Sequence, residues 1–305
     1  MQNSKFVISL DFELHWGVFD AYGNKYNKNI LGARKAIPKI LDLFNKYEIE
    51  ATWATVGLLF NEKRDEHVNY NPSLKPSYDD KNLNSYDCKI GDDENSDPLH
   101  FAHSLIKLIN ESHGQEIACH TYSHYYCKAE GQNIAEFDED IKSSVRIAKE
   151  KFNLNLKSFV FPKNEVTDEY IKVLKNNSIE IFRDSYRNKF SSNILERLYR
   201  LFNTYFALSK FSKNSVQEKH GVKAIYGDRF LRPYTKSFMN NLMLRRIKDE
   251  MLEAAQCNSI YHLWWHPHNF GQNLDQNLNN LEQILVHYTQ LKSKYNMSSI
   301  CMKNL

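Results

Sequence analysis

Short apolar runs alternate with amphipathic stretches along most of the chain. Runs that favour buried strands occur at residues 5–13, 49–57, 116–119, 158–161, 179–182, 259–265 and 298–302. Apolar residues at helical spacing predict helices over residues 32–47, 99–112, 135–152, 168–176, 237–256 and 274–295. Strand and helix therefore alternate about seven times, which is typical of a parallel sheet with helical crossovers, open or closed into a barrel.

Two long stretches interrupt this alternation. Residues 61–98 are polar and rich in Asn, Asp, Lys and Pro, so they offer little apolar surface for a core of their own. The second stretch covers residues 184–236. Because the chain has no internal repeat and no clear linker, we expect a single α/β catalytic domain over residues 1–305, with insertions at about 61–98 and 184–236.

Composition narrows the class of protein. Apolar residues make up 42% of the 305 residues and charged residues 25%, which excludes a disordered or fibrous chain. No apolar run approaches the length of a membrane-spanning helix, and the first residues do not resemble a secretory signal. The five cysteines are scattered without zinc or redox spacing. We therefore expect free thiols and a cytoplasmic location.

Charge is distributed unevenly, although the net charge is only +3. Residues 183–236 hold twelve Lys and Arg against four Asp and Glu, which suggests an anionic partner. Nucleic acid is not expected, because no recognition motif accompanies the charge. Within this stretch, residues 192–211 are amphipathic at helical spacing. They could form a lid packed against a barrel mouth, or a helix in peripheral contact with a membrane surface.

The candidate chemistry lies at strand ends. Asp11 and Glu13 are two residues apart on one strand, so both side chains point to the same face. His120 and His124 follow the strand over 116–119, and a four-residue gap on one helical turn places both imidazoles on one side. Two histidines and a carboxylate form a three-ligand set for zinc or a similar ion, with a fourth position open to water. Each pair taken alone also has a purely structural interpretation: the carboxylates could lie at a solvent-exposed strand end, and the histidine pair could occur by chance.

Two further predicted strands also end in polar residues. His266 and His268 follow the strand over 259–265, and Lys163 and Asn164 follow an apolar run that ends at Pro162. In folds with parallel strands, active groups gather at the carboxyl ends of the strands. These residues are therefore expected on the same rim as the carboxylates, although histidines in such a segment are also typical of packing positions.

Taken together and in this order, the four segments resemble the motifs of the polysaccharide deacetylase (NodB-homology) family, also called carbohydrate esterase family four. Residues 9–13 are similar to the first motif in the branch whose second acid lies two residues after the first. Residues 120–124 match the His-(Ser/Thr)-x-x-His motif, and residues 161–164 are similar to the Phe-Pro-Arg-Asn form of that branch. The last motif histidine falls within residues 266–269. The resemblance covers most of the chain outside the two insertions.

The resemblance implies a distorted (β/α)7 barrel and a role for each motif residue. Asp11 would be the general base, and His266 would be the general acid with His268 as a competitor. The metal ligands would be Glu13, His120 and His124. Because a glutamate reaches one methylene further than the family's usual aspartate, Asp11 and Glu13 could also exchange roles.

The third motif departs from the family pattern at Lys163, which stands where an arginine is usual. A lysine cannot make the bidentate contact by which an arginine would hold the base. By the same resemblance, substrate contacts are expected from Lys163, Asn164, Trp264 and His268.

The implied activity is metal-dependent hydrolysis, with Zn²⁺ as the expected ion, of an N-acyl group, most simply acetyl, on an amino sugar of cell-surface polysaccharide biosynthesis. A nucleotide-linked or lipid-linked sugar would suit the basic stretch. Hydrolysis of another C–N bond, in a formamide or a non-sugar amide, is the alternative enzyme reaction. A catalytically inactive sugar-binding member of the fold is the alternative from another class. The sequence does not indicate an oligomeric state.

Overall fold

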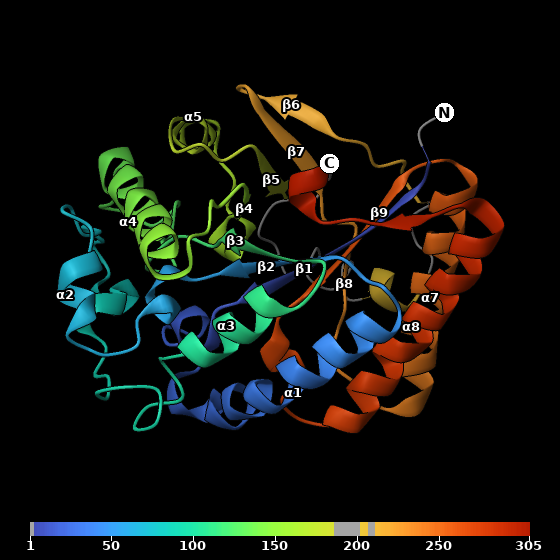
Figure 1. Ribbon diagram of the computed structural model, residues 1–305, viewed down its shortest axis with the longest axis horizontal. Coiled ribbons are helices and arrows are strands. Elements are labelled where there is room, and N and C mark those ends of the chain that lie inside the picture. Colours follow the sequence, from blue (N-terminus) through green and yellow to red (C-terminus); the bar gives the residue numbers. More distant parts are fainter. Residues whose placement is uncertain (1–2, 186–201, 207–210) are drawn as a thin grey trace.

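The computed structural model describes residues 3–185, 202–206 and 211–305, which form helices around one curled sheet (Figure 1). The strands follow the order β6-β7-β5-β4-β3-β2-β1-β9-β8, with β10 paired to the start of β1, and only the β6–β7 pair is antiparallel. Their bounds are β1 Lys5–Phe12, β2 Ala51–Thr55, β3 Gln115–Cys119, β4 Ser158–Val160, β5 Ile181–Asp184, β6 Gln217–Lys219, β7 Val222–Tyr226, β8 Arg229–Phe230, β9 Ile260–Trp265 and β10 Ser298–Ser299.

The α-helices pack along the outside of this sheet, where α7, α8, α1 and α3 follow one another and α4 contacts α5 (Figure 1). Their bounds are α1 Asn27–Lys46, α2 Glu66–Tyr70, α3 His103–Glu111, α4 Ile134–Phe152, α5 Asp168–Asn176, α7 Ser237–Gln256 and α8 Leu274–Tyr295. The last three have the bounds that the apolar spacing predicts, whereas α1 begins at Asn27 rather than at residue 32. None of the helices in the described ranges is both long and apolar enough to cross a bilayer.

The main difference from the sequence prediction lies in residues 184–236, which are expected to form an insertion. This stretch contains β6, β7 and β8. β7 pairs with β5, and after Gly227 and Asp228 the chain continues as β8 and pairs with β9, so one extended stretch joins both sides of the curled sheet. Counted as one strand together with β1–β5 and β9, it gives the seven strands of a distorted (β/α)7 barrel. The two pieces are too short to show a clear apolar period.

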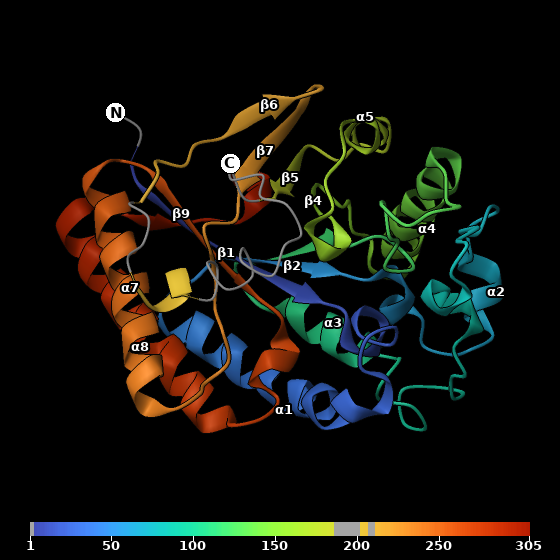
Figure 2. The ribbon, with the colours of Figure 1, turned by 180° about the vertical axis from the view of Figure 1, so that it is seen from behind.

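The interior of the barrel changes from apolar to polar along β1, which lies between β9 and β2 (Figure 2). Val7, Ser9 and Asp11 alternate with residues that pack against the helices, so they share the inner face. Val7 lies in a small apolar cluster at the amino ends of the strands, with Ile181, Ile225, Ile260 and Met302. Ser9 and Asp11 lie further along, and β1 therefore delivers its polar groups to the carboxyl end of the barrel.

The polar stretch 61–98 is attached through buried polar contacts near the end of β1. Asp97 accepts a hydrogen bond from His100 Nδ1 at 2.8 Å, and His100 Nε2 lies 3.0 Å from His15 Nδ1. Trp16 donates its indole N–H to the carbonyl of His100 at 2.9 Å. The stretch is thereby fixed to the segment that directly follows Glu13.

The amphipathic stretch predicted over 192–211 lies mostly outside the described residues, since 192–201 and 207–210 are not among them.

Candidate active site

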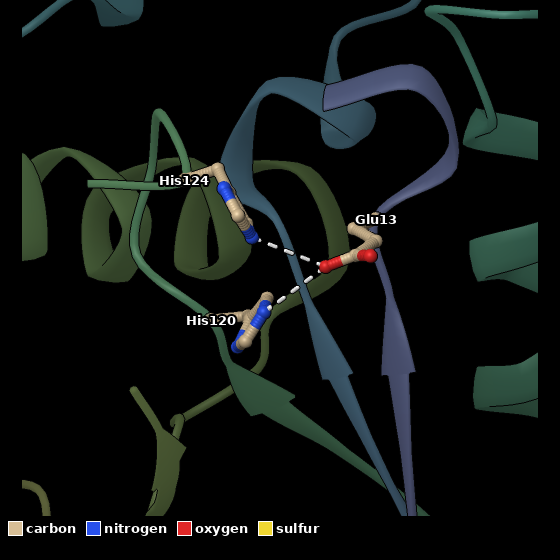
Figure 3. Close-up of side chains that lie close together, drawn as sticks. All are labelled: Glu13, His120 and His124. Atoms are coloured by element: carbon tan, nitrogen blue, oxygen red, sulfur yellow. Dashed lines mark ion pairs between the residues drawn. The ribbon is translucent and has the colours of Figure 1, made fainter. Parts of the chain in front are cut away.

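A carboxylate and two imidazoles converge at the carboxyl ends of β1 and β3. Glu13 directly follows β1, and its Oε2 lies 3.4 Å from His120 Nε2 and 3.1 Å from His124 Nε2 (Figure 3). All three side chains are at most 4% exposed. Their ligand atoms lie within 4.8 Å of one another, so one ion can contact all three. The structure thus brings together the three residues predicted as metal ligands.

The hydrogen bond on the far side of His120 tests whether these residues suit a cation. His120 Nδ1 lies 2.8 Å from the carbonyl oxygen of Val160, which can only accept, so this nitrogen carries the hydrogen. In the neutral ring, Nε2 then directs a lone pair at the carboxylate of Glu13. Two buried acceptors facing each other require a proton or a cation between them. A backbone carbonyl behind a metal-binding histidine is also the usual way to fix its orientation. The residues therefore fit a divalent ion.

The loop that carries both histidines is held by a buried carboxylate on α4. Asn133 caps α4, because its side chain accepts from the backbone N–H groups of the first turn. One turn further along, Asp140 accepts hydrogen bonds from the backbone N–H groups of Tyr122 and Ser123 and from the Ser123 hydroxyl. Burial raises the pKa of Asp140 to about 7, against the effect of these hydrogen bonds.

The same loop has an unusual backbone. Thr121 and His124 adopt positive φ values of 61° and 58°, which side-chain-bearing residues rarely do. The hydrogen bonds to Asp140 hold this conformation, and with it the direction of both imidazoles.

A second group of possible ligands lies on the other oxygen of Glu13. Glu13 Oε1 is 3.5 Å from His266 Nε2 and 4.0 Å from His268 Nδ1. The two rings are stacked, with centroids 4.8 Å apart and planes inclined by 14°. An imidazole binds a metal in the plane of its ring, and a single ion cannot lie in two stacked planes. We therefore assign the ion to the side of His120 and His124.

The two histidines after β9 differ in their surroundings. Burial, together with the charge of the neighbouring His266, lowers the pKa of His268 to about 3, so His268 is neutral near pH 7. His266 is 24% exposed and its Nε2 lies 3.7 Å from Asp11 Oδ2. Of the two predicted candidates for the general acid, His266 therefore has the access to solvent and the position beside Asp11 that proton transfer requires.

Asp11 is held by a buried arginine that the sequence reasoning did not identify. Arg183, near the end of β5, donates from Nη1 and Nη2 to the two carboxylate oxygens of Asp11, each at 2.7 Å. Its other donors contact Ser9 Oγ at 2.9 Å and Asn164 Oδ1 at 3.0 Å, and its guanidinium lies 4.3 Å from the ring centre of Trp264. This is the fork-shaped ion pair that the lysine in the third motif cannot make.

Lys163 lies elsewhere, at the rim of the barrel. Its Nζ contacts Asp20 Oδ2 at 2.9 Å and lies 3.9 Å from the ring centre of Tyr126. Asn164 supports Arg183, and Trp264 covers it. Of the residues predicted to contact substrate, Lys163 and Trp264 are partly exposed, whereas His268 is 5% exposed.

The two carboxylates are held in their charged form by different neighbours. Burial alone would raise the pKa of Asp11, but the charge and hydrogen bonds of Arg183 lower it below its ordinary value. Burial likewise opposes ionisation of Glu13, but the surrounding imidazoles, above all the charge of His266, hold its pKa well below the ordinary value.

Comparison with known proteins decides the family. A sequence model of the family described as polysaccharide deacetylase matches residues 19–182, more than half of the chain. The chain belongs to the polysaccharide deacetylase family. The matched range includes His120 and His124 and begins after Asp11 and Glu13. No curated protein matches it in sequence.

Solved structures share the fold of this chain at low sequence identity. A putative polysaccharide deacetylase from Mycobacterium smegmatis has a TM-score of 0.63 and 10% identity, over 99% of this chain and 88% of that chain. A probable polysaccharide deacetylase from Pseudomonas aeruginosa PAO1 has a TM-score of 0.57 and 11% identity, over 99% and 88%. A 4-alpha-glucanotransferase from Thermococcus litoralis also reaches 0.57, at 11% identity, over 100% of this chain and 40% of that chain. The fold alone therefore does not indicate the activity.

Proposed function

We propose that this chain hydrolyses the N-acyl group, most simply acetyl, of an amino sugar, with a divalent ion held by Glu13, His120 and His124. The observation that carries the proposal is a pair of buried carboxylates at the carboxyl end of β1, of which Glu13 faces imidazoles and Asp11 faces a guanidinium. Zn²⁺ suits a site of one carboxylate and two imidazoles. When bound, such an ion polarises the acyl carbonyl and lowers the pKa of a water molecule.

The protein's own residues supply the proton transfers. Asp11 accepts a proton from the attacking water, and Arg183 keeps it charged and fixes the direction of its oxygens. His266, beside Asp11 and open to solvent, donates a proton to the nitrogen that leaves. The acyl group departs as a carboxylate and the sugar as an amine, so the reaction consumes one water and needs no organic cofactor.

The substrate class rests on the family together with the surface around the site. Trp264 lies beside Arg183, and Phe230 packs against it with the ring centroids 4.7 Å apart and the planes inclined by 56°, so a partly exposed aromatic surface lies next to the arginine that binds Asp11. A sugar ring can pack on such a face. In a cytoplasmic protein, a nucleotide-linked or lipid-linked sugar would be the available donor, and the basic residues of 183–236 would favour its phosphate.

Acyl release from defined substrates tests the proposal. We would load the purified protein with Zn²⁺ and incubate it with free, nucleotide-linked and lipid-linked N-acetyl amino sugars, with a formamide and a non-sugar amide as comparison substrates. We expect acetate and free amine in equal amounts from one of the sugars, and no release from the Asp11→Asn protein. Hydrolysis of only the comparison substrates would show that the substrate is an amide other than an N-acyl amino sugar. A protein that binds the ion and hydrolyses none of them would be a binding protein.

A further inference from the structure

Gly17 lies directly against the carboxylate of Glu13. After β1, the 3-10 turn Leu14–Gly17 reverses the chain, and the backbone N–H of Trp16 donates to the carbonyl of Glu13 at 3.1 Å. This turn brings residue 17 under the side chain of residue 13. A Cβ atom added to Gly17 would overlap Cδ and both carboxylate oxygens of Glu13, all at under 3.0 Å.

The backbone itself does not require glycine at this position. The positive-φ glycines are Gly23, Gly114, Gly131 and Gly221, and Gly17 is not one of them. An alanine could therefore adopt the same backbone conformation. Glycine is needed at residue 17 because the carboxylate of Glu13 lies too close for a Cβ atom to fit.

The carboxylate has no free space into which it could move from Gly17. The Glu13 side chain is 4% exposed, with His120 and His124 on its Oε2 side and His266 on its Oε1 side. A displaced carboxylate would approach the imidazoles or turn away from them. In either case Oε2 would leave the position in which it shares an ion with both histidines.

We infer that Gly17 is a positioning residue for the metal ligand Glu13, because its bare Cα is the surface against which this longer carboxylate folds back to reach the ion. The inference rests on the proposed function, since it assumes that Glu13 binds an ion. It also gives a physical reason why a glutamate can serve in a site for which an aspartate is usual. An aspartate at residue 13 would not extend over Gly17 in this way.

The test measures the affinity of the protein for Zn²⁺ by competition with a chromogenic chelator, without any assay of turnover. We expect Gly17→Ala to bind Zn²⁺ at least about tenfold more weakly, the size of effect typical of residues that support a ligand. With Co²⁺ in place of Zn²⁺, the absorption spectrum of the variant should change, because one ligand has moved. Gly23→Ala is the matched control, since Gly23 lies on the same segment with nothing near its Cα and a positive φ of 48°. It should lower the Tm and leave Zn²⁺ affinity unchanged.

A second pair of variants separates displacement of Glu13 from damage to the turn. In the Glu13→Ala chain, Gly17→Ala should leave the Tm of the metal-free protein unchanged or raise it slightly, because the overlapping atoms are gone and alanine restricts the unfolded chain. Wild-type affinity in Gly17→Ala would overturn the inference, and so would an equal loss of Tm in both backgrounds. If the wild-type protein bound no ion, the proposed function would fail first, and the two failures are thereby distinguishable.

Discussion

Asp11 and Glu13 both carry carboxylates and are two positions apart in the sequence, yet the structure surrounds them differently. Asp11 lies within β1, and the guanidinium of Arg183 on β5 donates hydrogen bonds to both of its carboxylate oxygens. Glu13 lies past the end of β1, over a glycine and between imidazoles. A permanent cation leaves Asp11 charged and fixed, ready to accept a proton. Glu13 has no guanidinium bound to its two oxygens, and its Oε2 faces the Nε2 atoms of His120 and His124, with which it could share an ion. The neighbours, rather than the residue type, divide the roles.

The largest effect is expected on the side of Glu13. The double substitution His120→Ala/His124→Ala removes two of three ligands, so bound metal should fall from about one ion per chain to almost none, with activity lost and the fold retained. Elemental analysis and circular dichroism measure the two outcomes. Full metal content in this variant would show that the ion binds beside His266 and His268 instead.

On the other side of the comparison, Asp11→Asn should keep the metal and lose turnover. An amide cannot accept the proton that a carboxylate takes, so kcat should fall by about 10²–10⁴-fold. Steady-state kinetics and metal analysis on the same preparation check both parts. Loss of the metal, rather than of turnover alone, would show that Asp11 and Glu13 have exchanged roles.

Arg183→Lys should shift the pH dependence. In the proposed reaction Asp11 acts as the base in its ionised form, and Arg183 lowers the pKa of that carboxyl. A lysine keeps the charge and loses the bidentate contact, so the pKa of Asp11 should rise and the acidic limb of kcat/KM should move to higher pH, by about one unit or about 1.4 kcal/mol. Arg64→Lys is the control, because Arg64 pairs with Asp92 on the surface. An unchanged acidic limb in Arg183→Lys would separate the arginine from the base.

The smallest effect is expected for Lys163→Met. Lys163 is 42% exposed and pairs with Asp20, not with Asp11. Because Asp20 is only 9% exposed, loss of this pair leaves a largely buried carboxylate without its cation and should lower stability by about 1–3 kcal/mol, but the effect on activity is the smallest because the acidic limb of kcat/KM should stay in place. Thermal unfolding and a pH profile check this. A shift as large as that of Arg183→Lys would mean that Lys163 acts on the base after all.

The parts of the site that could be predicted from the sequence are those that one short segment contains. His120 and His124 lie in one short segment, and Glu13 directly follows the strand that bears Asp11, so the sequence indicates that the members of each pair lie close together. The helical turn predicted for the two histidines is wrong, because they lie on a loop in which Thr121 and His124 have positive φ values. The helices over 237–256 and 274–295 show a full apolar period and have the predicted bounds.

The partner of Asp11 could not be found in this way. Arg183 lies 172 residues away, on the four-residue strand β5. The apolar run in the sequence predicts a strand that ends one residue before Arg183, at residue 182. Arg183 is one of the twelve Lys and Arg residues of 183–236, so nothing in the sequence distinguishes it as the partner of Asp11. Gly17 gave no signal either, because what matters there is an atom that is absent, and only the folded turn shows which side chain occupies the space.

The pairing of β1 has a consequence for how the protein forms. Its edges are covered by β2 on one side and by β9 on the other, where Lys5 pairs with Ile260. During synthesis, β1, which bears Asp11 and leads directly to Glu13, therefore cannot pair on its second edge until residues 260–265 have left the ribosome. Until then one long, apolar strand edge is open to wrong partners, and such distant pairing is slow. The carboxyl end of β1, where both acids lie, is therefore completed late, by a pairing between segments about 255 residues apart.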